Sequence, residues 1–126
     1  MNGFKDLEIY KRSYRAAKAV REMTKDFPDA EKHAMVSQMQ RASLGIPMNI
    51  AEGYAKRESQ AEFKRFLKMA YGSASEMQVL IDFAYDVSYI EENQHKKAMQ
   101  EYVEISKMLN AFISSVAKKE TEHPKI

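Results

Sequence analysis

Four long stretches of this chain carry apolar residues at helical spacings of three and four, and only short interruptions separate them. The stretches cover about residues 6–26, 30–55, 60–87 and 91–118. Helices of such lengths span about 30 to 42 Å, and connections of a few residues force sequential neighbours to run antiparallel. The sequence therefore predicts an all-α fold, an antiparallel up-down-up-down four-helix bundle.

The interruptions have the chemistry of helix ends. Pro28 disfavours helical backbone at Phe27, and Asp29 is suited to cap the following helix. Ser59 and Glu62 have the spacing of a capping box, in which the serine accepts an early amide and the glutamate reaches back. We expect the third helix to begin directly after Ser59.

Pro47 lies inside the second stretch, where it removes one hydrogen bond and crowds the carbonyl of Ser43. The apolar stripe keeps its phase across the proline, so we expect a single second helix, kinked at Pro47. Two shorter helices are the alternative.

With 126 residues, the chain has the length of one domain. It has no cysteine, no apolar run of the roughly 20 residues that cross a bilayer, and no apolar stretch typical of a signal peptide at its start. We expect a cytoplasmic protein without a membrane partner. Residues 1–119 are predicted to form the bundle and residues 120–126 a frayed polar tail.

Small and polar residues interrupt the apolar stripes in the middle of the second and third helices. We expect these two helices to pack closely and to be joined by side-chain hydrogen bonds. A carboxylate buried there, such as Glu52 or Glu76, would need a partner, which Arg41 or Asn49 could supply. A structural role is favoured over a catalytic one. The candidate polar network comprises Gln38, Arg41, Asn49, Glu52, Ser73 and Glu76.

The same two patches carry a family resemblance. The run Asn49-Ile50-Ala51-Glu52-Gly53 is its most specific mark, and the segment from Phe66 to Glu76 and the opening Phe4-Lys5-Asp6-Leu7 extend it. From about Phe4 to Val116, the chain resembles the bacterial four-helix-bundle proteins that are encoded by intervening sequences within large-subunit ribosomal RNA genes and were formerly labelled ribosomal.

This resemblance implies a left-handed bundle that assembles as a ring, commonly a homopentamer. The accessory variability proteins of diversity-generating retroelements look like distant relatives, and they bind nucleic acid and a reverse transcriptase. The family's molecular function is largely undetermined.

Enzymatic chemistry finds little support in the sequence. The two Glu-x-x-His pairs, Glu92 with His95 and Glu120 with His123, fall at the start of the fourth helix and in the tail. A di-iron bundle needs them on two facing helices. The chain also lacks a glycine-rich phosphate loop and a nucleophile elbow. We expect a non-enzymatic protein with no catalytic residues, no metal and no cofactor.

The net charge of +2 hides a strong segregation of charge along the chain. Residues 1–26 hold seven basic and four acidic residues, whereas residues 82–106 hold two basic and six acidic ones. In an antiparallel bundle, the second connection lies at the same end as the start of the first helix. The candidate nucleic-acid contacts are Lys5, Lys11, Arg12, Arg15, Lys56, Arg57, Lys64 and Arg65.

Two functions remain open. One is low-specificity binding of RNA or DNA through backbone phosphates, since no base-reading motif is present. The alternative is a protein-interaction scaffold without nucleic-acid binding, for example a partner of a reverse transcriptase or of a ribosomal component. Tyrosine suits partly hydrated interfaces, because its ring is apolar and its hydroxyl is polar. Tyr85 and Tyr89 are therefore the candidate contacts between subunits.

Overall fold

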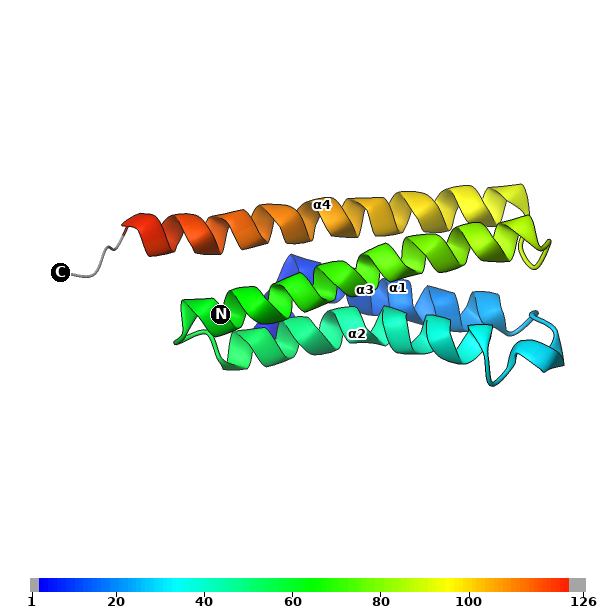
Figure 1. Cartoon of the computed structure of the whole chain (residues 1–126), viewed down its shortest axis with the longest axis horizontal. Helices are drawn as coiled ribbons and strands as arrows, with labels where there is room; N and C mark the ends of the chain where they lie inside the picture. The colour runs from blue at the N-terminus through cyan, green and yellow to red at the C-terminus, as the bar shows by residue number, and fades with distance from the viewer. Residues whose placement is uncertain (1–2, 123–126) are drawn as a thin grey trace.

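The computed structural model describes residues 3–122, which form four long helices and no strand. Figure 1 shows consecutive helices running in opposite directions, with α2 and α4 on either side of α3. The predicted all-α four-helix bundle is therefore confirmed. The helices are α1 (Glu8–Thr24), α2 (Met35–Ala55), α3 (Gln60–Asp86) and α4 (Glu92–Glu122), with one-turn 3-10 helices η1 (Phe4–Asp6) before α1 and η2 (Asp29–Glu31) before α2.

The connection between α1 and α2 is longer than predicted. We expected the second helix to begin at Ala30, but η2 and a turn precede its true start at Met35. The Tyr89 hydroxyl donates a 2.7 Å hydrogen bond to Glu31, and the Tyr89 ring packs on buried Phe27. This tertiary contact ties the connection to the α3–α4 turn and favours compact turns over an early helix.

Helix α2 continues without interruption through Pro47, which is buried. The alternative of two shorter helices is thus wrong, while the kink at Pro47 stays a prediction. At the other end of the chain, α4 extends to Glu122, past the predicted domain boundary at residue 119. Most of the predicted tail, residues 123–126, lies outside the described part of the chain.

The core is built from the predicted apolar stripes, and its α2–α3 part uses many small side chains. Ala42 on α2 and Ala70, Ala74 and Ala84 on α3 are fully buried. Short side chains allow two helix axes to approach closely. The larger fully buried residues are Met39, Ile46, Ile50, Leu67, Met77, Ile81, Tyr102, Ile105 and Leu109.

Two glycines of α2, Gly45 and Gly53, lie directly against residues of α3. A Cβ added at Gly53 would lie 2.9 Å from the Phe66 Cβ and 3.3 Å from the Phe63 carbonyl oxygen. A Cβ at Gly45 would lie 3.1 Å from the Ser73 hydroxyl oxygen. The backbone cannot yield easily at Gly53, so this position requires glycine.

We predict that Gly53→Ala lowers the free energy of unfolding by about 1 to 3 kcal/mol, the usual cost of overpacking. The matched control is Gly72→Ala on α3, where an added Cβ meets nothing within 4 Å. Because alanine favours helix, the control should raise stability by up to about 1 kcal/mol. Urea unfolding of both variants measures the difference, and equal effects would contradict the close approach at Gly53.

Candidate nucleic-acid interface

The turn between α2 and α3 begins with two cations whose backbones end α2. The Lys56 amide donates to the Gly53 carbonyl, and the Arg57 amide donates to the Tyr54 carbonyl. Ser59 then caps α3, because its hydroxyl accepts a 3.2 Å hydrogen bond from the Glu62 amide. That half of the predicted capping box is confirmed. The Glu62 carboxylate instead pairs with Arg65 at 2.8 Å.

Aromatic rings hold the cations of this turn in place. The Lys56 ammonium lies 4.8 Å and the Arg65 guanidinium 4.4 Å from the centre of the Phe66 ring. The Arg57 guanidinium lies 4.0 Å from the centre of the Tyr54 ring and donates to the Tyr54 carbonyl at 2.9 Å. Cations over ring faces are attracted by the ring quadrupole. We call Lys56, Arg57, Lys64 and Arg65 the turn cluster.

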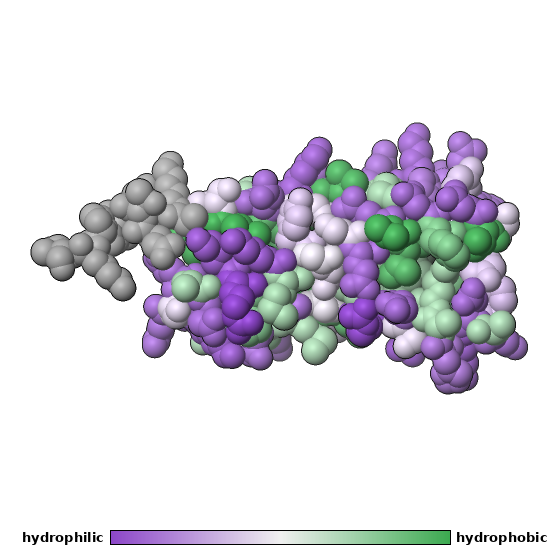
Figure 2. Space-filling view, viewed as in Figure 1, coloured by the Kyte–Doolittle hydropathy of each residue, from purple (hydrophilic) through white to green (hydrophobic). Residues whose placement is uncertain are grey.

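Two acids, Glu58 in the turn and Glu62 on α3, lie among the cations of the turn cluster. The hydrogen bond from Arg65 lowers the pKa of the Glu62 carboxyl and raises the pKa of the Arg65 guanidinium. Lys56, Arg57 and Arg65 are exposed, and Lys64 is half-buried. Figure 2 shows hydrophilic side chains gathered over the end of the bundle where α2 and α3 meet. With Glu58 and Glu62 counted against the four cations, the segment from Lys56 to Arg65 keeps a net charge of +2.

The predicted contacts on η1 and α1 do not all join the turn cluster. Phe4 packs into a hollow with Pro47 and Ala51, so exposed Lys5 lies beside the second half of α2. Exposed Lys11 makes a 3.7 Å ion pair with Glu8, and Arg15 is exposed one turn further along α1.

Arg12 faces a different side of the bundle from the turn cluster. Its Nε donates to Glu101 of α4 at 2.6 Å, and its Nη2 donates to the second carboxylate oxygen at 3.2 Å. This hydrogen bond raises the pKa of the Arg12 guanidinium. Arg12 therefore joins α1 to α4, in a structural role that the sequence analysis did not predict.

The predicted polar network is divided between two places. Arg41 bridges α2 and α3 through a 2.6 Å bond to Glu76, and it also donates to Gln38 at 3.0 Å. Asn49 donates to the Gly45 carbonyl of its own helix at 2.8 Å, and Glu52 is exposed. The Arg41 and Glu76 side chains are 64% and 37% exposed, so neither Glu52 nor Glu76 is a buried carboxylate, although Glu76 does pair with Arg41. Ser73 contributes by packing on Gly45.

The two candidate interface tyrosines differ in their surroundings. Tyr89 is half-buried and bonded to Glu31, and this bond raises the pKa of its phenol. Tyr85 is 38% exposed, and its ring packs on His95 with centres 4.7 Å apart. Of the two, Tyr85 leaves the larger fraction of its surface exposed for contact with another protein.

Within residues 3–116, whose side chains the structure describes, no group of three or more His, Asp or Glu is arranged to hold a metal ion. His95 lies against Asp82, with 2.7 Å between the ring nitrogen and the carboxylate, and His123 lies outside the described residues. None of the described helices is both long and apolar enough to cross a bilayer. The absence of an enzymatic metal centre stays a prediction.

Sequence reasoning found the cations of the turn but missed their aromatic supports. Phe63 and Phe66 fit the apolar spacing of the third helix, and both are buried in the structure. The missed signal for two of the pairs is the spacing: Arg65 directly precedes Phe66, and Arg57 follows Tyr54 by three residues, whereas Lys56 lies over Phe66, ten residues away. A basic residue beside each ring could have suggested the pairing.

We predict that Arg12→Gln lowers the free energy of unfolding by about 1 kcal/mol, because a bidentate, partly exposed pair with Glu101 is lost. Arg15→Gln, at an exposed position of the same helix, should change stability by less than about 0.5 kcal/mol. Thermal or urea unfolding compares the two. An equal loss in both variants would contradict the structural role of Arg12.

Comparison with known proteins places this fold in a family. The family model described as 23S rRNA-intervening sequence protein matches residues 5–111. A crystal structure of a protein of unknown function from the S23 ribosomal protein family of Bacteroides thetaiotaomicron superposes with a TM-score of 0.76 at 24% identity, covering 84% of this chain and 95% of that chain. No curated protein matches the sequence. The chain therefore belongs to the 23S rRNA-intervening sequence protein family.

Proposed function

We propose that this protein is a non-enzymatic, ring-forming bundle, a homopentamer by resemblance to its family, that binds RNA or DNA mainly through backbone phosphates. The turn cluster is the observation that carries the proposal. Its four cations lie on one turn and the first turns of α3, and aromatic rings hold three of them. A cation already held on a ring face loses less side-chain entropy when it meets a phosphate.

The same geometry argues for phosphate contacts over base contacts. Phe66 is only 8% exposed, with Lys56 and Arg65 over its ring, so the ring offers no open face to a base. Proteins that bind single strands by stacking present open aromatic faces. We therefore expect little sequence preference and a strong dependence on salt, since phosphate binding releases counterions.

An exposed apolar stripe on α3 supports assembly into a ring. Val79 and Phe83 on α3 and Val87 directly after it are between 39% and 68% exposed and follow one another at a spacing of four along one face. Figure 2 shows hydrophobic side chains over the half of α3 that leads to α4. Apolar residues aligned in this way are typical of protein interfaces. Assembly would place several turn clusters on one particle and raise the affinity by avidity.

We predict that the protein binds a fluorescent single-stranded RNA and a DNA duplex at low salt, with affinity falling steeply as salt rises. The triple variant Lys56→Gln/Arg57→Gln/Lys64→Gln should reduce the slope of log K against log salt by about 2 for the single strand and about 3 for the duplex. Fluorescence anisotropy at several salt concentrations measures both slopes.

The matched control removes three exposed lysines that lie away from the turn, as Lys32→Gln/Lys96→Gln/Lys107→Gln. It should keep most of the affinity, because the change in net charge is the same and only the position differs. Equal losses in the two triple variants would argue for a general charge effect. No binding by the unmodified protein at low salt would favour the alternative, a protein-interaction scaffold.

We predict that Val79→Glu combined with Phe83→Glu turns the oligomer into monomers, because two charges enter the apolar stripe. Met48→Glu on α2, at an equally exposed apolar position outside the stripe, should leave the assembly intact. Sedimentation velocity at micromolar concentration gives the particle mass. A monomeric unmodified protein would refute the ring, and dissociation by Met48→Glu alone would move the interface to α2.

A further inference from the structure

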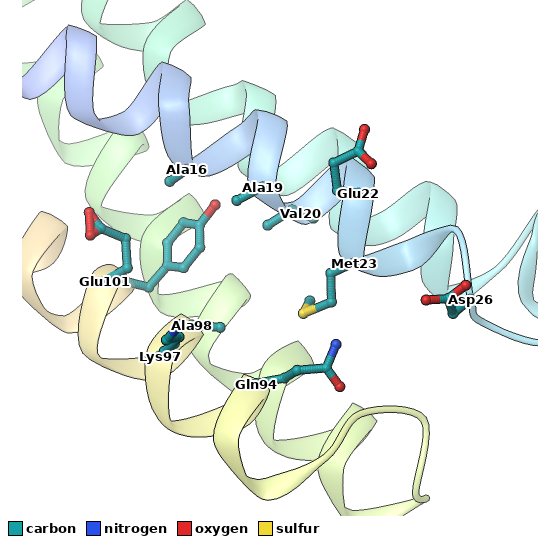
Figure 3. A pocket seen from close by; sticks show the side chains of 11 residues that line it. Ala16, Ala19, Val20, Glu22, Met23, Asp26, Gln94, Lys97, Ala98 and Glu101 are labelled. Carbon is teal, nitrogen blue, oxygen red and sulfur yellow. The ribbon is translucent and has the colours of Figure 1, made fainter.

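A cavity of about 400 Å³ lies between α1 and α4, on a side of the bundle that the proposed function does not use. Figure 3 shows the side chains of α1 facing those of α4 across this space. Its walls are largely apolar. They are formed by Ala16, Ala19, Val20 and Met23 from α1 and by Ala98 and Tyr102 from α4.

The cavity is a groove that is partly open to solvent, and side chains from both helices flank it along the bundle axis. At one end the ion pair between Arg12 and Glu101 joins the two helices at 2.6 Å. At the other end, Figure 3 shows Met23 from α1 and Gln94 from α4 pointing toward one another. The volume of this groove lies within the range of small-molecule sites.

Tyr102, which lines the cavity, carries a polar group without a hydrogen-bond partner among the described residues. This group is its hydroxyl, and the residue is only 1% exposed. Burial raises the pKa of this phenol, so it remains a protonated donor at neutral pH. Buried hydroxyls are almost always paired. The hydroxyl lies beneath the cavity surface, so a hydrogen bond between it and a ligand would require α1 to move outward from α4.

The charges around the cavity are nearly balanced. Glu101 pairs with Arg12, and Glu22 pairs with Lys25 at 2.9 Å. The two other charged residues of the lining, Asp26 and Lys97, have opposite signs. A charged ligand would therefore gain little electrostatic stabilisation from the charged residues that line the cavity.

We propose that the α1–α4 cavity binds a small, uncharged, mostly apolar molecule that offers one oxygen acceptor to the Tyr102 hydroxyl. The apolar walls supply most of the affinity through burial of the ligand's carbon skeleton. The hydrogen bond to Tyr102 orients the ligand and selects molecules that carry the acceptor. This site is independent of nucleic-acid binding at the turn cluster.

The test uses two probes of the same shape, benzophenone and diphenylmethane, which differ only in the carbonyl. The full-length protein is labelled with ¹³C at its methionine methyl groups. We expect benzophenone to shift the Met23 signal, which lies in the cavity, and to leave the signal of exposed Met48 unchanged. Diphenylmethane should bind about three- to tenfold more weakly, the value of one net hydrogen bond.

Two variants make the assignment specific. Tyr102→Phe removes only the unpaired hydroxyl, so the protein should stay folded and the preference for benzophenone should vanish. Ala19→Phe fills the cavity from an exposed position and should abolish binding of both probes, whereas Ala61→Phe on α3 should not.

Four results would overturn the proposal. They are an unmoved Met23 signal with both probes, equal affinity of the unmodified protein for the two probes, a preference that survives in Tyr102→Phe, and dissociation of an oligomer by Ala19→Phe. The last result would assign the cavity to contact between copies of the chain. None of these results depends on nucleic-acid binding, so the two proposals fail separately.

Discussion

The close approach of α2 and α3 is the constraint on which the other features of this structure depend. It requires glycine at position 53, where any Cβ would enter the van der Waals shell of Phe66, and small side chains at Ala42, Ala70 and Ala74. Because the two helices meet so closely at their joined ends, the turn between them is short. The chain leaves α2 at Ala55 and enters α3 at Gln60. The positions of the turn's side chains are therefore set by core packing.

This packing also accounts for the display of the turn cluster. Phe66 must face α2 to meet Gly53, and its ring then lies beneath Lys56 and Arg65. The Phe66 ring packs on the core and is covered on its outer side by Lys56 and Arg65. The alkyl parts of Lys56 and Arg65 are thus shielded by the ring, while their charged groups remain in water. The cationic surface is thus a consequence of the same contact that closes the bundle.

The sequence predicted four helices because the apolar stripes are long and keep their phase, which makes periodicity decisive. It failed at residues 30–34, where the chain is held by Tyr89 bonding to Glu31, a partner 58 positions away. It failed again at Arg12, whose partner Glu101 lies 89 positions away. Charge counting assigned Arg12 to a basic surface, but no local pattern reveals an acid on a distant helix. The turn cluster was predicted because its members are neighbours in sequence.

The bundle is asymmetric, and this asymmetry separates its two proposed sites. Glycines and alanines bring α2 and α3 together, whereas α1 and α4 leave a cavity beside Tyr102. The cavity is lined by the second half of α1 and the first half of α4, so it lies toward the end of the bundle opposite the α2–α3 turn (Figure 1). A ligand that moves α1 slightly from α4 changes no contact of Gly53 or Phe66. Coupling between sites needs an element with two arrangements that both ligands bias. The tightly packed α2–α3 pair offers no such element, so we expect the cavity and the turn cluster to act independently.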